Sequence, residues 1–406
     1  MQKPELLAPA GDLEKLKSAI VYGADAVYLG GKQFSLRAGA SNFGPEELSA
    51  GVDFAHRHGA KVFTAVNIFA HNQDVEGLPE YFKQLQHAGV DGVIASDPGV
   101  ISILRKAAPE LPIHLSTQAN TTNYLSAAFW QQQGVKRIVL ARELSLPEIS
   151  EIAEKVNVEL EVFIHGAMCM AYSGRCLLSN YMTGRDANRG DCAQPCRWKY
   201  NLVEQKRPDQ YFPVEEEDRG TYFMSSRDLS LIEHIPELIK AGVKSLKIEG
   251  RMKSVHYVTT VVKSYRQAID SYFDDPKNYT FDPKWLDEIS KVSHRDYTTG
   301  FILGQPGGEA QSDKSSQYRR DYRFVGVVRD YDHSTGMALV EQRNNFAVGD
   351  KVEVLQPQGE NFTVIIKEIY NEKDQAQPNA PHPQQRIKLP MPLVEEWSML
   401  RLVVKK

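Results

Sequence analysis

The feature that most constrains the fold is a joint that recurs between residues 5 and 251. A helix-like segment ends at a Gly, and an apolar strand-like run follows within a few residues. The joint is found in YGADAVYL, AGVDGVIA, QGVKRIVL and AGVKSLKI. This order is typical of βα units in a parallel sheet. Strand-like runs lie at residues 5–10, 26–31, 61–67, 92–96, 113–118, 137–141, 160–166 and 245–251. Eight such runs predict an α/β fold, a (β/α)8 TIM-like barrel.

An open, doubly wound dinucleotide-binding sheet is the alternative for alternating strands and helices. Its glycine-rich loop is expected after the first strand, but LLAPAGDLEKL does not contain G-x-G-x-x-G. Instead, Asp12 is a suitable N-cap for a helix that Gly23 would end. The barrel is therefore favoured.

The alternation stops after the seventh strand, where residues 167 to about 235 form a long insertion with all four cysteines. In a barrel this insertion would leave from the C-terminal face, where active sites lie. We expect a barrel over residues 1–310, a polar linker over 311–323 and a small all-β barrel of six strands over 324–406. The last domain could bind RNA or form a lid over the barrel.

Charge and apolar patterning restrict the partners. The net charge of the 406-residue chain is −4, so any nucleic-acid contact must come from a local patch. The N-terminus does not resemble a secretory signal, and no run approaches the roughly 20 apolar residues of a membrane span. We expect a cytoplasmic protein without a membrane partner. In that compartment, clustered cysteines hold metals more often than they form disulfides.

The cysteine spacing is C-x6-C-x15-C-x3-C, formed by Cys169, Cys176, Cys192 and Cys196. Thiolates are ligands for iron–sulfur clusters and for zinc. Zinc sites usually have short knuckles at both ends, and only the second pair here approaches that spacing. An iron–sulfur cluster is therefore favoured, with zinc as the alternative. Four unrelated buried thiols or a redox pair are further alternatives, although C-x-x-C is absent.

Polar residues at other predicted strand ends are candidates for the site. Residues 240–267 contain seven Lys or Arg and one acid, Glu249. Arg251 and Lys253 could clamp a carboxylate or a phosphate, although a solvated helix face is the plainer interpretation. Further candidates for substrate binding are Arg37, Gln118, Asn120 and Arg142, each of which could equally serve its own loop.

His165 lies four residues before Cys169 and allows two further interpretations. A thiol and an imidazole could form the dyad of a cysteine protease. Four clustered thiols are poorly suited to that role, because they bind metal or oxidise together. Otherwise His165 is either a hydrogen-bonded residue at a strand end or a polar group that faces the substrate.

EVFIHGAMCMAYSGRCLLS, at residues 161–179, closely resembles the signature of the peptidase U32 family. The opening ELLAPAGDLEKLKSAIVYGADAVYLGG and the stretch LKIEGRMKS resemble the same family, so the resemblance covers residues 5–260. The family is named for collagenase-like proteases. Its better understood members look like proteins that hydroxylate tRNA, ribosomal RNA or ubiquinone precursors and that carry a [4Fe–4S] cluster on four cysteines.

Members with an added C-terminal β-domain look like tRNA-modifying enzymes that convert the wobble uridine to 5-hydroxyuridine with prephenate-derived chemistry. The resemblance thus implies tRNA as partner, prephenate as cosubstrate and a paralogous subunit as a candidate partner. Cys169 and Cys176 match the family signature, and Cys192 and Cys196 complete the four ligands. With this function, His165 and Glu249 become candidates for proton transfer or positioning. A collagenase-like peptidase is the alternative function.

Overall fold

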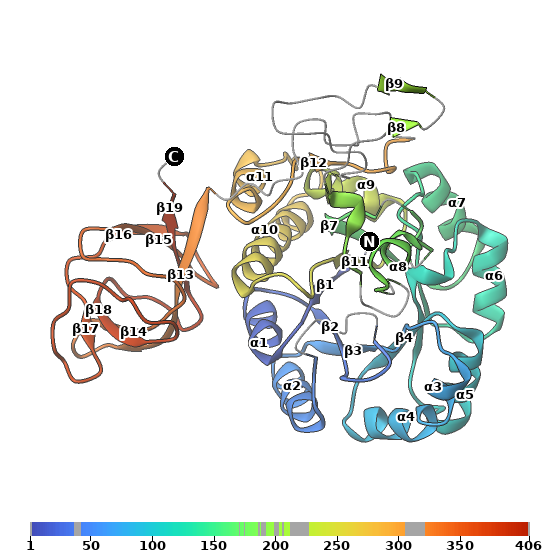
Figure 1. Cartoon of the computed structure of the whole chain (residues 1–406), viewed down its shortest axis with the longest axis horizontal. Helices are drawn as coiled ribbons and strands as arrows, with labels where there is room; N and C mark the ends of the chain where they lie inside the picture. Colours follow the sequence, from blue (N-terminus) through green and yellow to red (C-terminus); the bar gives the residue numbers. More distant parts are fainter. Residues whose placement is uncertain are drawn as a thin grey trace.

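A computed structural model of the chain describes residues 2–304 and 321–404, apart from 36–41, 170, 174, 186, 188–191, 199–202, 205–206 and 212–226. Eight parallel strands form a barrel, and each strand pairs with the following one (Figure 1). The eighth strand pairs with the seventh and also with the first, which closes the barrel. They are β1 (Glu5–Pro9), β2 (Ala26–Gly30), β3 (Lys61–Ala65), β4 (Gly92–Ala95), β5 (Ile113–Leu115), β6 (Arg137–Val139), β7 (Glu159–Ala167) and β11 (Ser245–Ile248). The predicted barrel is confirmed.

The barrel strands are apolar along most of their length because both faces are buried. Leu7, Tyr28 and Phe63 belong to a small cluster inside the barrel. Their neighbours along the chain, such as Leu6 and Leu29, belong to the larger core that includes the helices. Side chains therefore alternate between the barrel interior and the helix layer, and the interior positions reach the site.

A ring of helices covers the outside of the barrel (Figure 1). Asp12 caps the first helix by accepting a hydrogen bond from the Lys15 amide at 2.9 Å, and Gly23 follows its end with φ +104°. Within the described residues, no helix is both long and apolar enough to span a bilayer. The helices are α1 (Leu13–Val21), α2 (Pro45–Arg57), α3 (Asn72–Val75), α4 (Leu78–His87), α5 (Pro98–Ala107), α6 (Tyr124–Gln132), α7 (Leu146–Lys155), α9 (Ile235–Lys240), α10 (Val255–Asp274) and α11 (Pro283–Ile289).

The chain returns to β7 after the insertion. Strand β10 (Asp228–Ser230) pairs with β7 in the antiparallel direction, and β12 (Tyr297–Thr298) pairs with β10. A buried ion pair, with Arg295 Nη2 2.5 Å from Asp228 Oδ1, joins β10 to the chain that enters β12. The sequence pattern did not predict a strand here.

Residues from Tyr322 onward form an antiparallel sheet of seven strands that curls into a half-barrel around its own apolar core. Six strands were predicted, and the run at residues 362–371, expected as one strand, contains two of the seven. The order across the sheet is β16-β15-β19-β13-β14-β18-β17. The strands are β13 (Tyr322–Asp332), β14 (Met337–Gln342), β15 (Lys351–Leu355), β16 (Phe362–Ile365), β17 (Tyr370–Asn371), β18 (Arg386–Pro390) and β19 (Met399–Val403).

This β-domain packs beside the barrel, against α1, α10 and α11 (Figure 1). Tyr22, directly after α1, donates to the Leu355 carbonyl at 2.8 Å, and Lys263 on α10 donates to the Gln356 carbonyl at 2.7 Å. The guanidinium of Arg401 lies between two carboxylates, 2.5 Å from Glu288 Oε1 and 3.1 Å from Glu353 Oε2. These buried polar contacts fix the domain to the barrel wall, which does not favour a lid, one of the two roles that the sequence left open.

Candidate functional site

The C-terminal mouth of the barrel has a tyrosine–carboxylate pair at its rim. The hydroxyl of Tyr28, on the inner face of β2, has two acceptors for its one proton, Glu249 Oε2 at 3.1 Å and the Ile248 carbonyl at 3.0 Å. Gly166 on β7 has φ +111°, and a Cβ there would lie 2.6 Å from the Glu249 carbonyl oxygen. Only glycine fits this position, so the backbone of Glu249 is held closely against β7.

Arg142 follows β6 and joins the barrel to the cysteine-bearing loop. Its guanidinium carbon lies 3.8 Å from the centre of the Phe163 ring, and its Nη1 donates to Ser173 Oγ at 3.1 Å. Phe163 lies on β7, and Ser173 lies between Cys169 and Cys176. A cation over an aromatic face is held by the ring quadrupole, so Arg142 anchors this loop at the mouth.

Beneath the rim, the barrel interior contains a buried network of charges. Lys247 Nζ lies 2.7 Å from Glu161 Oε1 and 4.5 Å from the centre of the Tyr28 ring. Arg137 lies 3.3 Å from Glu161 and 2.5 Å from Glu5. Burial acts to raise the pKa of Glu161, but Lys247 and Arg137 outweigh it and hold that pKa below its ordinary value. The carboxylate therefore stays ionised, and the network provides a rigid, charge-compensated floor.

His165 lies in the packing between β7 and α10. Its ring contacts Tyr257, Tyr265 and Tyr297, with Nδ1 3.4 Å from Tyr265 Oη. Burial lowers the pKa of His165 to about 3, so the ring is neutral over the physiological range. The tyrosines enclose this predicted catalytic residue, and its backbone carbonyl accepts from the Glu249 amide at 2.9 Å.

Gln118 and Asn120 lie in the turn that follows β5 and bond within it. Gln118 Oε1 accepts from Ser116 Oγ at 3.1 Å, and Asn120 Nδ2 donates to the Gln118 carbonyl at 3.0 Å. Asn120 has φ +52°, a conformation that asparagine tolerates better than most residues. These contacts agree with the loop role that the sequence left open.

The basic stretch at residues 240–267 does not form one solvated face. Arg251 is buried and donates to Ser35 Oγ at 2.8 Å. Lys247 lies inside the barrel, Lys263 lies against the β-domain, and the ammonium of Lys253 is 5.0 Å from the centre of the Tyr257 ring. Arg251 and Lys253 therefore remain near the mouth as candidates, whereas Arg37 lies outside the described residues.

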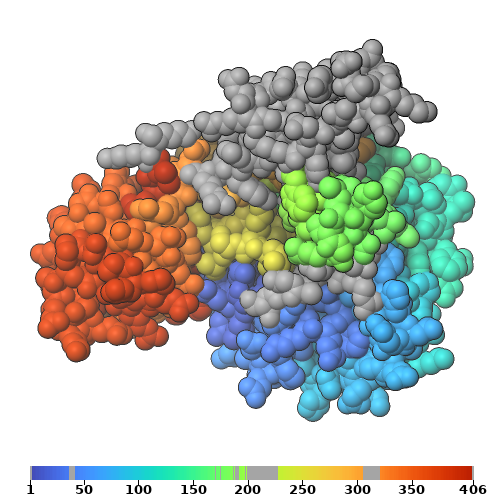
Figure 2. Space-filling view, viewed as in Figure 1, coloured from blue at the N-terminus to red at the C-terminus, as the bar shows by residue number. Residues whose placement is uncertain are grey.

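The cysteine segment crosses the mouth and carries a short helix, α8 (Leu178–Thr183). Figure 2 shows its described part, in green, over the end of the barrel. Cys169 follows β7 and Cys176 precedes α8, whereas the second pair lies around a 3-10 turn at Pro195–Arg197. The Ala193 amide donates to Ser179 Oγ at 2.9 Å, which ties the second pair to α8.

The donor chemistry of the segment fits a thiolate-bound metal group. None of the four cysteines forms a disulfide bond, Cys169 and Cys192 are exposed, and the Gln194 amide donates to Cys192 Sγ at 3.4 Å. Among the described residues, no three Cys, His, Asp or Glu side chains are grouped as a metal site. Binding of a cluster would therefore require the four thiols to move closer to one another. Cluster binding would then be coupled to the conformation of the cysteine segment.

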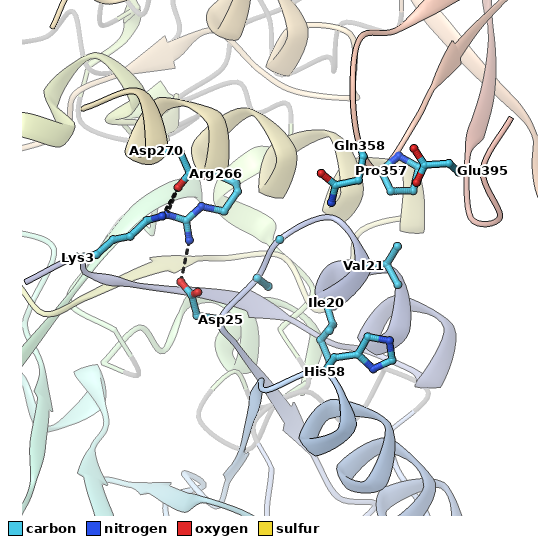
Figure 3. Close-up of a pocket in the computed structure, with 12 residues that line it drawn as sticks. Lys3, Ile20, Val21, Asp25, His58, Arg266, Asp270, Pro357, Gln358 and Glu395 are labelled. Carbon is cyan, nitrogen blue, oxygen red and sulfur yellow. Dashed lines mark hydrogen bonds and ion pairs between the residues drawn. The ribbon is translucent and has the colours of Figure 1, made fainter. Parts of the chain in front are cut away.

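The described part of the chain also encloses two cavities. One, of about 530 Å³, opens between the β-domain and the N-terminal ends of the barrel strands (Figure 3). Arg266 in its wall pairs with two carboxylates, 2.9 Å from Asp25 and 2.7 Å from Asp270. The other, of about 780 Å³, lies between α2 and α4 in the helix layer. Among the described residues, no predicted site residue lines either cavity.

Sequence reasoning missed Tyr28, Phe163, Lys247 and Ser173. The first three occupy inward positions of barrel strands, so the alternation along each strand could have identified them. Ser173 could not be found in this way, because its contact with Arg142 depends on the path of a loop. The mouth can thus hold a carboxylate, a guanidinium and a thiol-rich segment close together.

Comparison with known proteins covers most of the chain. The family model "Peptidase family U32" matches residues 11–312, and the model of the family's C-terminal domain matches residues 320–401. The tRNA hydroxylation protein P1 of Bacillus subtilis is 50% identical over 95% of this chain and 92% of its own length. The tRNA hydroxylation protein P of Escherichia coli is 40% identical over 97% and 94%. The 23S rRNA 5-hydroxycytidine C2501 synthase of Escherichia coli is 34% identical over 88% of this chain and 55% of its own length.

Proposed function

This chain belongs to peptidase family U32, and from that premise we propose that it hydroxylates tRNA, converting the wobble uridine to 5-hydroxyuridine. The observation that carries the proposal is the nearly full-length similarity to two tRNA hydroxylation proteins. A relative that acts on ribosomal RNA at C5 of a cytidine is consistent with the same reaction class.

The chemistry of the reaction requires more than side chains, because C5 of uridine is poorly reactive and amino acids do not supply oxygen-atom transfer. We propose that Cys169, Cys176, Cys192 and Cys196 hold a [4Fe–4S] cluster beside the mouth. When bound, such a cluster would supply redox or Lewis-acid chemistry. Four cysteines that form no disulfide, on a segment anchored at the mouth, support this assignment, with zinc as the alternative.

The chain's own residues would then position the substrate. The Glu249 carboxylate, oriented by Tyr28 at 3.1 Å, is placed to accept a proton or a hydrogen bond at the rim. Arg142 and Arg251 lie beside the mouth and are suited to anionic groups, including the carboxylates of prephenate as the proposed cosubstrate. Ser173 and Ser35 orient these two guanidinium groups.

The peptidase alternative requires a thiol–imidazole pair. Three tyrosines enclose the His165 ring, whereas the Cys169 thiol is exposed, so the described geometry gives this alternative no support. A cytoplasmic location and a paralogous subunit stay predictions.

Nucleoside mass spectrometry of total tRNA tests the proposal. Cells that lack the gene should lose 5-hydroxyuridine and its derivatives, and the wild-type gene should restore them. A Cys169→Ala gene should not restore them, whereas a Phe129→Ala gene, altered on the outer face of α6, should. An unchanged tRNA profile in the deletion strain, when no second copy of the gene is present, would contradict the proposal.

A further inference from the structure

The cysteine segment exposes a group of large apolar side chains around the barrel mouth. Tyr181 is 88% exposed, Leu177 66%, Tyr172 45% and Trp198 42%. Scattered apolar residues are ordinary on protein surfaces, but an exposed group of this kind on one short segment indicates a binding surface. We call these four residues the aromatic face.

The segment holds the aromatic face in a defined place. The Tyr181 amide donates to the Leu177 carbonyl at 2.9 Å, so these two residues lie one helical turn apart on the same side of α8. The Arg175 amide donates to the Tyr172 carbonyl at 3.0 Å, and the neighbouring Ser173 is bonded to Arg142. The Ala193–Ser179 bond holds the chain that leads to Trp198. The aromatic face is thereby connected to the barrel rim.

Charge on the same segment favours an anionic partner. Residues 169–198 contain four Arg, two Asp and no Glu or Lys, a net charge of +2 in a chain whose net charge is −4. Arg175 is exposed, and its guanidinium carbon lies 5.7 Å from the Phe69 ring at the rim. Aromatic rings with interspersed arginines are typical of surfaces that bind single-stranded nucleic acid, where bases stack and phosphates are neutralised.

We propose that the aromatic face binds unpaired nucleotides next to the target base. Tyr181 and Trp198 provide the stacking surfaces, and Arg175 contacts the RNA backbone. This inference rests on the proposed function. If the barrel mouth acts on tRNA, a surface beside the mouth contacts the RNA, and for this reason we favour RNA over a protein as the partner. The cysteine segment would then both carry the four cysteines and bind the RNA substrate.

The test measures binding of a fluorescein-labelled anticodon stem-loop RNA by anisotropy in the full-length protein. Tyr181→Ala and Trp198→Ala should each weaken binding by about 5- to 100-fold, the loss expected for one base stack. Arg175→Gln should weaken binding and lower the slope of log affinity against log salt by about one. Tyr181→Ala should leave that slope unchanged. Phe129→Ala on α6, 53% exposed, is the matched control and should bind as the wild type does.

The outcomes separate the two proposals. If the wild type binds the RNA and restores 5-hydroxyuridine in cells, but Tyr181→Ala and Trp198→Ala bind equally well, this inference is overturned and the proposed function stands. If the wild type neither binds the RNA nor restores the nucleoside, the proposed function itself fails. Circular dichroism and thermal midpoints equal to those of Phe129→Ala ensure that weaker binding is not loss of folding.

Discussion

Arg142 donates a hydrogen bond to Ser173 across 3.1 Å, and this contact joins the end of β6 to the loop between the first two cysteines. The same guanidinium covers the ring of Phe163 on β7. The cysteine segment is therefore attached to the barrel beyond its two chain ends, at the point where the proposed chemistry takes place.

Replacing Ser173 by Ala distinguishes anchoring from direct substrate binding by Arg142. A hydrogen bond to a charged group contributes about 1.5–3 kcal/mol. If Arg142 acts as an anchor, Ser173→Ala and Arg142→Gln should lower tRNA hydroxylation by similar factors, about tenfold or more, and should make the segment easier to cleave in limited proteolysis. A strong effect of Arg142→Gln with wild-type behaviour of Ser173→Ala would instead assign Arg142 to the substrate.

The four cysteines should behave as one set. After anaerobic purification, the wild type should contain iron and absorb broadly near 400 nm (roughly the thiolate-to-iron charge-transfer region), and air should bleach this band. Single Ala substitutions at Cys169, Cys176, Cys192 and Cys196 should each lose the band and the nucleoside product. A colourless wild type with one zinc per chain would contradict the cluster, and a band retained in Cys196→Ala would remove Cys196 from the ligands.

The interface between the barrel and the β-domain should depend on Arg401. This side chain is fully buried between Glu288 and Glu353. Arg401→Met leaves the two carboxylates with Lys291 as their partner, and we expect the free energy of unfolding in urea to fall by about 3 kcal/mol. Lys388→Ala, which breaks the exposed pair with Asp374, should change it by less than about 0.5 kcal/mol. Equal stabilities would contradict the role of Arg401.

Acid should weaken the same interface through His256, whose ring stacks on Phe324 with centroids 5.4 Å apart. Burial, aided by Arg401 and Lys291, lowers the pKa of His256 from 6.5 to about 3. Between these values the unfolded chain binds a proton that the folded chain does not, so stability falls as the pH decreases. The contribution is at most about 1.4 kcal/mol per pH unit.

His256→Phe keeps the stack but cannot take up the proton, so its stability should depend less on pH between about 6.5 and 3. Urea titrations at several pH values measure this dependence. The exposed residue His382, changed to Gln, serves as the control. A pH dependence of His256→Phe equal to that of the wild type would show that the ring does not sense acid.

Local sequence patterns determine the barrel well because each βα unit carries its own signals. The Asp12 cap and the positive φ of Gly23 occur where the sequence predicted them. Strand β10 was missed because it has three residues and depends on Arg295, which lies 67 positions away from Asp228. Contacts between residues so far apart leave no periodic signal.

The sequence predicted which kinds of residue form the candidate site, but not which of them are buried and which are accessible. Lys247, Arg251 and Lys263 form one basic stretch in the sequence, yet they lie respectively in the barrel interior, at the rim and against the β-domain. Alternation along β11 separates Lys247 from its neighbours, and the docking of a second domain covers Lys263. Tertiary packing of this kind decides which charges stay available to a ligand.

Strand β7 lies beside both the departure and the return of the inserted chain, because Ala167 at its end pairs with Asp228. The ring of the barrel closes through β7 and β11 without using residues 168–227. The chain between Ala167 and Asp228 is thus an insertion whose two ends are adjacent. Because its two ends are adjacent, a change in the length of this insertion need not separate the strands of the barrel, and under the proposed function it would be a route by which one barrel comes to accept a different RNA.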